Sequence, residues 1–277
     1  MQKDLFKKYL EETFGVKAAG KVLEALECPP SVSVRLNPSK WNVGDGTNTE
    51  IADAGINGKV PWSEWGYFLK ERPVFTLDPL IHAGAYYVQD SSSMFVGFVF
   101  RQVLGQMLGE EPVAERRSLR VLDLCAAPGG KTTDLAASLR EMVGDRFILV
   151  SNEVMKNRAG ILADNVALWG DPNVVVTSAD PAAFSRLEGF FDIIVTDVPC
   201  SGEGMFRKDE GAVEQWSEDN VELCVARQRR ILADIWPALA PGGFLIYSTC
   251  TFNKYENDGN VGWAASELGA AVRVADC

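Results

Sequence analysis

The chain has 277 residues, 47% of them hydrophobic, and a formal net charge of −11 at pH 7. This size allows a large hydrophobic core, while the acidic net charge argues against a protein that binds nucleic acid through one broad basic face. No apolar run reaches the roughly 18 residues of a membrane-spanning helix. The six cysteines form no Cys-x-x-Cys pair and no secretion signal is evident, so we expect free thiols, no metal site and a cytoplasmic protein.

The first part of the chain, residues 1–110, predicts a small α+β region with an accessory or RNA-binding role. Apolar side chains recur at helical spacing near its start, an alternating segment follows, and a long apolar helix comes last. A charged segment over 110–117 predicts a domain boundary. The expected elements are one amphipathic helix over 3–27, an exposed strand over 31–37, a short-stranded unit over 41–80 and a helix over 91–108.

From residue 111 the pattern changes to strands that alternate with helices. Alternation of this kind is typical of a parallel sheet with right-handed crossovers. It predicts a Rossmann-like α/β domain over 111–277. The expected strands are 119–124, 146–151, 173–178, 191–197 and 243–249, with helices over 130–142, 155–168 and 213–239 and a further strand over 271–274.

A glycine-rich turn follows the first of these strands. It reads Cys125-Ala126-Ala127-Pro128-Gly129-Gly130-Lys131 and leads into a helix. Small residues let a ligand approach the backbone, and the start of a helix offers free N–H groups. The spacing matches neither the dinucleotide fingerprint nor the phosphate loop. The turn therefore predicts a ligand site without a triphosphate cradle.

Acidic residues follow three consecutive strands: Glu153, Asp180 and Asp197. In open parallel sheets, ligands bind outside the carboxyl ends of the strands. Glu153 is placed to hold ribose hydroxyls, and Asp180 to receive an adenine amino group. Each acid alone is explained equally well as a helix cap or a solvated charge. Together they describe a pocket for a nucleoside without phosphates, which fits S-adenosylmethionine.

Two cysteines, Cys200 and Cys250, each end an apolar run of strand length at this same edge. A lone strand-end cysteine is often a core residue, but two thiols beside Asp197 predict a reaction centre. One alternative is a methyltransferase acting on amines, which needs no thiol and commonly carries an aromatic residue after its Asn/Asp-Pro-Pro turn. Another is a non-catalytic assembly factor that binds ribosomal RNA.

Three segments of the chain resemble signature motifs of the Nol–Nop–Sun RNA cytosine 5-methyltransferases. They are residues 123–132, 197–204 and 248–251, while residues 35–37 and 84–94 resemble the N-terminal motif of that family and the segment that leads into its catalytic domain. Within the family, the chain is most similar to bacterial enzymes that act on small-subunit ribosomal RNA.

The resemblance implies methyl transfer from S-adenosylmethionine to carbon 5 of a cytosine in ribosomal RNA. Cys250 would be the nucleophile, and Cys200 would assist release of the product. Lys131 would lower the pKa of the nucleophilic thiol, and Asp197 would hold the base. The implied cofactor contacts are Cys125, Ala126, Ala127, Pro128, Gly129, Gly130, Lys131, Glu153, Asp180 and Asp197. The expected partner is small-subunit ribosomal RNA or a ribosomal particle, with no DNA, no membrane and a monomeric enzyme.

RNA contacts outside the reaction centre are harder to predict. Candidates for flanking phosphates are Arg35, Lys40, Arg207 and Lys208, although a solvated surface charge explains each of them more simply. The fold of the family normally continues to a seventh strand, and its ribosomal members often add an RNA-binding domain. We therefore expect this chain to be a C-terminally shortened form, which would account for the missing basic surface.

Overall fold

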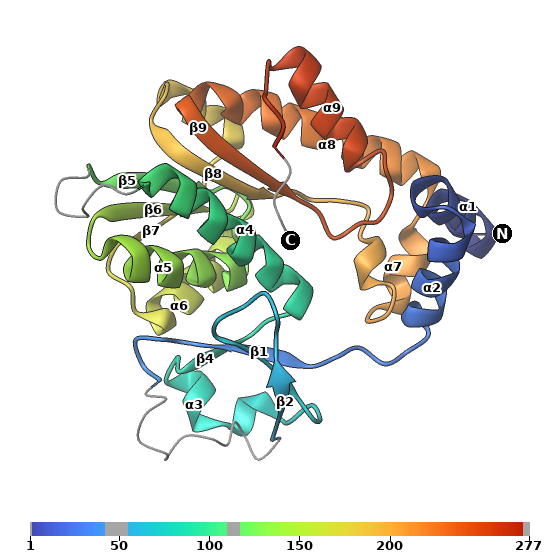
Figure 1. Ribbon diagram of the computed structural model, residues 1–277, viewed down its shortest axis with the longest axis horizontal. Coiled ribbons are helices and arrows are strands. Elements are labelled where there is room, and N and C mark those ends of the chain that lie inside the picture. Colours follow the sequence, from blue (N-terminus) through green and yellow to red (C-terminus); the bar gives the residue numbers. More distant parts are fainter. Residues whose placement is uncertain (1, 42–54, 110–116, 274–277) are drawn as a thin grey trace.

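The computed structural model describes residues 2–41, 55–109 and 117–273, and this part contains a larger and a smaller sheet (Figure 1). The larger sheet is parallel, with five strands in the order β7-β6-β5-β8-β9. Its order reverses between β5 and β8, the position where ligands bind in open sheets. The predicted Rossmann-like fold is therefore confirmed. The strands are β5 (Leu119–Asp123), β6 (Phe147–Asn152), β7 (Val174–Thr177), β8 (Phe191–Asp197) and β9 (Leu239–Ser248).

Helices cover both faces of the larger sheet. On one face, Phe100 of α4 and Leu139 of α5 pack against the central strands. On the other face, Ile231 and Ile235 of α8 do the same. Because both faces are covered, the central strands are continuous apolar runs, which is why the sequence predicts them well. The helices of this part are α4 (Ser91–Leu108), α5 (Gly130–Val143), α6 (Lys156–Trp169), α7 (Glu210–Gln215), α8 (Glu218–Ile235) and α9 (Asp258–Glu267).

The smaller sheet is antiparallel, in the order β2-β3-β1-β4. β1 lies between β3 and β4 and is buried along its whole length, so the prediction of an exposed strand over 31–37 is wrong. A central strand with both faces covered has no exposed side, although its sequence alternates. The elements are β1 (Ser33–Leu36), β2 (Ile56–Lys59), β3 (Gly66–Leu69), the short helix α3 (Pro79–His82) and β4 (Tyr86–Val88).

The first segment forms a hairpin of two helices, α1 (Gln2–Phe14) and α2 (Val16–Leu26), so the single helix predicted over 3–27 is wrong. Gly15 between them has φ 77°, a left-handed conformation that glycine adopts without steric cost. The apolar spacing continues across this break, which hides it from a periodicity analysis. The hairpin lies beside α7, far along the chain (Figure 1).

Two further predictions change. The helix predicted over 213–239 is two helices, α7 and α8, because Ser217 caps α8 by accepting the Asn220 amide at 3.1 Å. No strand forms over 271–273, and residue 274 lies outside the described residues. Most of the predicted charged linker and part of the unit over 41–80 also lie outside them.

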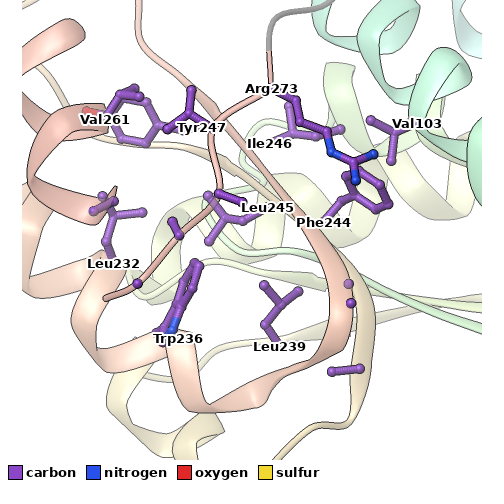
Figure 2. Close-up of a pocket in the computed structure, with 18 of the residues that line it drawn as sticks. Val103, Leu232, Trp236, Leu239, Phe244, Leu245, Ile246, Tyr247, Val261 and Arg273 are labelled. Atoms are coloured by element: carbon purple, nitrogen blue, oxygen red, sulfur yellow. The ribbon is translucent and has the colours of Figure 1, made fainter. Parts of the chain in front are cut away.

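β9 is an edge strand of the larger sheet, and an apolar groove of about 640 Å³ runs along it. Figure 2 shows Leu232 and Trp236 around this groove, with Arg273 beside Phe244. The guanidinium of Arg273 lies 5.3 Å from the centre of the Phe244 ring. None of the site residues predicted from the sequence lines it. The predicted site residues Cys200 and Cys250 follow the carboxyl ends of β8 and β9 instead.

Candidate active site

The glycine-rich turn after β5, here called the cofactor loop (residues 124–131), lines a cavity of about 200 Å³. Gly129 has φ 113° and precedes the first turn of α5, a conformation that favours glycine. A Cβ atom on Gly130 would lie 3.2 Å from Cε1 of Tyr87, so glycine keeps this passage open. Predicted site residues that line the cavity are Cys125, Ala126, Ala127, Pro128, Gly130, Lys131 and Asp197.

The opposite wall of this cavity comes from the N-terminal part of the chain and was not predicted. It consists of Tyr87, Val88, Gln89, Asp90 and Ser93, from β4 and the start of α4. Residues 84–94 carry the family resemblance, and that resemblance is the signal from which these contacts could have been found. The cavity therefore lies where the two sheets meet.

A buried amide donor at this wall has no acceptor within the described part of the chain. Gln89 is 6% exposed, and its Oε1 accepts a 2.8 Å hydrogen bond from Nε of Arg35. Since a guanidinium only donates, the amide oxygen must face Arg35. The Gln89 Nε2 group then has no partner among the described residues. A buried donor of this kind is costly unless a ligand or water accepts from it.

Arg35 joins the smaller sheet to the cofactor loop. Its side chain is 1% exposed, so the predicted contact with an RNA phosphate is wrong. Nη2 donates to the carbonyl of Gly130 at 3.0 Å and to Oγ1 of Thr133 at 2.6 Å. The guanidinium also stacks 4.6 Å from the centre of the Trp169 ring. Arg35 thereby holds the first turn of α5 in place.

The other candidate phosphate contacts remain predictions, and two of them have protein partners. Lys40 donates to the carbonyls of Leu168 at 2.7 Å and Ala83 at 3.0 Å. Lys208 pairs with the carboxylate of Asp90 on the cavity wall. An RNA phosphate would therefore have to compete with groups already bound to these ammonium ions.

The acids after β6 and β7 lie at the expected edge but do not line the cavity. Glu153 is 4% exposed and accepts the Met155 amide at 2.9 Å. Arg158 lies 3.2 Å from it and also donates to the carbonyl of Ala127 at 2.9 Å, which connects Glu153 to the cofactor loop. Asp180 is exposed and caps the next turn by accepting from Ala182 at 3.0 Å. Their contacts with ribose and adenine stay predictions.

Asp197 ends β8 and is held by two neighbours. Lys131 Nζ donates to its Oδ2 at 2.7 Å, and Ser248 Oγ donates to its Oδ1 at 2.8 Å. These contacts bring together the start of α5 and the ends of β8 and β9. The structure thus assembles a cation and a carboxylate that the sequence places 66 residues apart.

The two predicted thiols meet beside this pair. The Sγ atoms of Cys200 and Cys250 lie 3.1 Å apart. The hydrogen bond from Cys200 lowers the pKa of Cys250, and Lys131 lowers it further, against the opposing effect of burial. The same hydrogen bond raises the pKa of Cys200. Cys250, which is exposed, is therefore the thiol that loses its proton more readily, and Cys200 is the thiol that keeps it.

Cys125 behaves differently from these two. Burial raises its pKa to about 12, so its thiol is unreactive at neutral pH. Cys125 lines the cavity beside the cofactor loop. Within residues 2–41, 55–109 and 117–273, no group of three or more His, Cys, Asp or Glu side chains is arranged to hold a metal ion. No helix in that part of the chain has the length and apolar character needed to cross a membrane.

The reversed parallel sheet, with its glycine-rich loop and acidic strand ends, has the fold of a Rossmann-like methyltransferase. Residues 111–268 match the family described as 16S rRNA methyltransferase RsmB/F, and residues 3–91 match the N-terminal domain of 16S rRNA methyltransferase RsmF. The chain belongs to the RsmB/F family of 16S rRNA methyltransferases, and the resemblance to Nol–Nop–Sun enzymes is confirmed.

Curated relatives carry the name ribosomal RNA small subunit methyltransferase F. The protein from Shewanella loihica is 36% identical over 232 residues, which cover 83% of this chain and 45% of the relative. The protein from Klebsiella pneumoniae is 35% identical over 259 residues, covering 91% of this chain and 51% of the relative. The chain therefore spans about half the length of the curated relatives it matches.

Solved structures share the fold over nearly the whole chain. A methyltransferase homolog protein from Pyrococcus horikoshii is 28% identical with a TM-score of 0.75, covering 95% of this chain and 78% of the other. The NSun6 protein from the same organism, solved with SFG, is 19% identical with a TM-score of 0.75, covering 94% and 86%. At 19% identity, the likeness to the second structure supports the fold alone.

Proposed function

We propose that the protein transfers a methyl group from S-adenosylmethionine to carbon 5 of a cytosine in small-subunit ribosomal RNA. The observation that carries this proposal is the pair of thiols 3.1 Å apart, whose pKa values shift in opposite directions. An amine methyltransferase needs no such pair. Membership of a family of 16S rRNA methyltransferases supports the choice of RNA as substrate.

The cavity beside the cofactor loop fits S-adenosylmethionine in its chemistry. When bound, this cofactor supplies an electrophilic methyl group. The small residues of the loop allow close approach of a ligand, and the buried Gln89 amide offers a donor that lacks a partner among the described residues. We assign the cofactor contacts to residues 125–131, Glu153, Asp180 and Asp197. Gln89 is a further contact on the opposite wall.

Cys250 begins the reaction on the base. Carbon 5 of cytosine is a poor nucleophile, and addition of a thiolate to carbon 6 makes it enamine-like. The bond that forms joins Sγ of Cys250 to carbon 6, and carbon 5 can then attack the methyl group. Asp197 is suited to accept a hydrogen bond from the exocyclic amine and to stabilise a proton on ring nitrogen 3 as charge develops there during the addition. Lys131 lowers the pKa of Cys250 and donates a hydrogen bond to Asp197.

Cys200 acts after methyl transfer. A base must take the proton from carbon 5, so that the electron pair of that bond restores the 5,6 double bond and expels Cys250 as a thiolate. While Cys250 is an anion, it raises the pKa of Cys200. Once Cys250 is bonded to carbon 6, that anion is gone, and Cys200 can lose its proton more easily. The geometry thus makes Cys200 available at the step that needs a base.

The substrate base must leave its stack to reach these thiols, since both lie at the end of strands and not on an exposed helix. Unpaired RNA, or a ribosomal particle that presents an accessible cytosine, is therefore the expected partner. We assign the enzyme to the cytoplasm and to a monomeric state.

The test is a denaturing gel of the protein incubated with small-subunit ribosomal RNA and S-adenosylmethionine. We expect Cys200→Ala to form an RNA adduct that survives heat and detergent. Cys250→Ala should form no adduct and lose methylation by a factor on the order of 10³ or more. Methylation by Cys250→Ala at the wild-type rate would contradict the mechanism. RNA binding without any turnover would favour a non-catalytic assembly factor. A methyl group on the exocyclic amine would favour a methyltransferase that acts on amines.

A further inference from the structure

Two buried glutamates connect the loops that carry the thiols. We call residues 198–206 the Cys200 loop and residues 249–257 the Cys250 loop. Glu203 belongs to the first loop and Glu256 to the second, and both side chains are 0% exposed. The donors that satisfy them are backbone amides and uncharged side chains. Buried carboxylates at these positions need an explanation, because burying a charge is costly.

Glu203 holds the backbone of the Cys250 loop. Its Oε2 accepts from the amide of Phe252 at 2.7 Å and from the amide of Asn253 at 3.0 Å. Its Oε1 accepts from Nε1 of Trp216 at 3.0 Å. Glu203, three residues after Cys200, therefore fixes the backbone two and three residues after Cys250.

Glu256 holds the Cys200 loop in return. Its Oε2 accepts from the amide of Ser201, the residue after Cys200, at 3.0 Å. The same oxygen accepts from Nε2 of Gln228 at 2.7 Å, and Gln228 also donates to the carbonyl of Pro199 at 2.9 Å. Backbone groups on both sides of Cys200 are thus anchored to the other loop.

One side chain joins the two carboxylates. Nδ2 of Asn253 donates to Oε1 of Glu203 at 2.9 Å and to Oε1 of Glu256 at 2.8 Å. A carboxylate only accepts hydrogen bonds, so it can face several N–H groups at once. A glutamine at either position would turn its own NH₂ group toward one of these donors. This requirement explains why carboxyl groups occupy both positions, although neither forms an ion pair within the described part of the chain.

We infer that Glu203 and Glu256 are positioning residues that set the separation of the two thiols. Each anchors the backbone within three residues of the cysteine of the opposite loop, so the 3.1 Å contact between Cys200 and Cys250 depends on both. The catalytic meaning of this inference rests on the proposed function. It predicts that weakening either anchor slows release of the RNA more than it slows attack on the base.

The first experiment needs no RNA and uses dibromobimane, which becomes fluorescent when it bridges two neighbouring thiols. The wild-type chain should be bridged rapidly, and Cys200→Ala or Cys250→Ala should abolish the signal. We expect Glu256→Gln to slow bridging about tenfold, since it weakens charge-assisted hydrogen bonds. Glu203→Gln should act in the same direction. The matched control is Glu222→Gln, which removes an exposed carboxylate from α8 and should leave bridging unchanged.

Alkylation of Cys224 reports whether the variants keep their fold. Cys224 is buried in α8, and it should stay unreactive in every variant that supports the inference. Wild-type bridging rates in folded Glu203→Gln and Glu256→Gln proteins would overturn the inference. So would loss of bridging accompanied by a reactive Cys224 in both variants, because the glutamates would then hold the fold and not the thiol spacing.

The second experiment measures the RNA adduct. Glu256→Gln should accumulate the heat-stable adduct, as expected for Cys200→Ala, while first-turnover methylation falls by less than the rate of RNA release. Equal losses in both steps would contradict a positioning role. If Cys200→Ala itself forms no adduct, the proposed function fails, but the dibromobimane rates still decide whether the glutamates set the thiol separation.

Discussion

The two halves of the site are built in opposite ways. The cofactor loop comes from one continuous segment between β5 and α5, and its shape follows from local small residues and the start of a helix. The thiol centre comes from residues 50 positions apart, which meet through hydrogen bonds between loops. Local sequence therefore determines the first half, whereas long-range contacts determine the second.

The comparison implies that the two halves respond differently to mutation. Damage to the cofactor loop should appear as a change in folding stability, because the loop is part of the central sheet and its covering helices. Damage to the thiol centre should appear as a change in the distance or pKa of the thiols, with the fold intact. Three substitutions test this division.

The largest effect is expected at Asp123, at the end of β5. Burial raises the pKa of its carboxyl to about 6 from an ordinary value of 3.8. The folded state therefore binds this proton more tightly than the unfolded state does. The contribution of Asp123 to stability is present below pH 3.8 and is lost as the pH rises through 6. We expect this loss to amount to about 3 kcal/mol.

Asp123→Asn cannot titrate, and its stability should lack this dependence. Urea unfolding of both proteins from pH 4 to pH 8 isolates the effect, since their other titrating groups are shared. The stability of the wild type relative to the variant should fall as the pH rises. A constant difference across the range would show that Asp123 keeps an ordinary pKa.

A smaller effect is expected at Gly204, in the Cys200 loop. A Cβ atom there would lie 2.5 Å from the carbonyl oxygen of Cys250, and the glycine amide donates to that same oxygen at 2.7 Å. Because the neighbour is backbone, the loops must move apart. Gly204→Ala should slow bridging by dibromobimane about tenfold, by loss of a close hydrogen-bonded contact. Gly262→Ala in α9 has open space around its Cβ and should change nothing.

The smallest effect is expected for the pKa of Cys250 itself. Removing the hydrogen bond from Cys200 in Cys200→Ala should raise that pKa, since this bond is the largest cause of its depression. Alkylation of Cys250 by iodoacetamide at pH 7 should slow roughly threefold to tenfold and recover at higher pH. Mass spectrometry of each cysteine gives the rates. An unchanged rate would show that Cys200 does not lower the pKa of Cys250.

Much of the fold could be predicted, and the failures have physical reasons. Strands β5, β6 and β8 are buried on both faces and leave continuous apolar runs in the sequence. The break at Gly15 was missed because helical spacing resumes directly after it. The burial of Arg35 was missed because its partners lie on α5 and α6, roughly a hundred residues later.

The site shows the same limit. Cys200, Cys250 and Asp197 could be chosen because each ends an apolar run at the same edge of a parallel sheet. Glu203 and Glu256 could not, because nothing local distinguishes a glutamate that anchors a distant loop from one that faces solvent. Their roles depend on amides that lie about 50 residues away along the chain.

The hairpin of α1 and α2 has a consequence for the order in which the chain matures. The rings of Phe6 and Tyr9 pack on Trp216 at 5.7 and 5.4 Å, and Trp216 in turn donates to Glu203. During synthesis α1 emerges well before its packing partner, which follows some 200 residues later, as the separation of 209 between Tyr9 and Glu218 shows. The apolar face of the hairpin must therefore stay uncovered until Trp216 is made, and the same tryptophan then links the hairpin to Glu203 in the Cys200 loop.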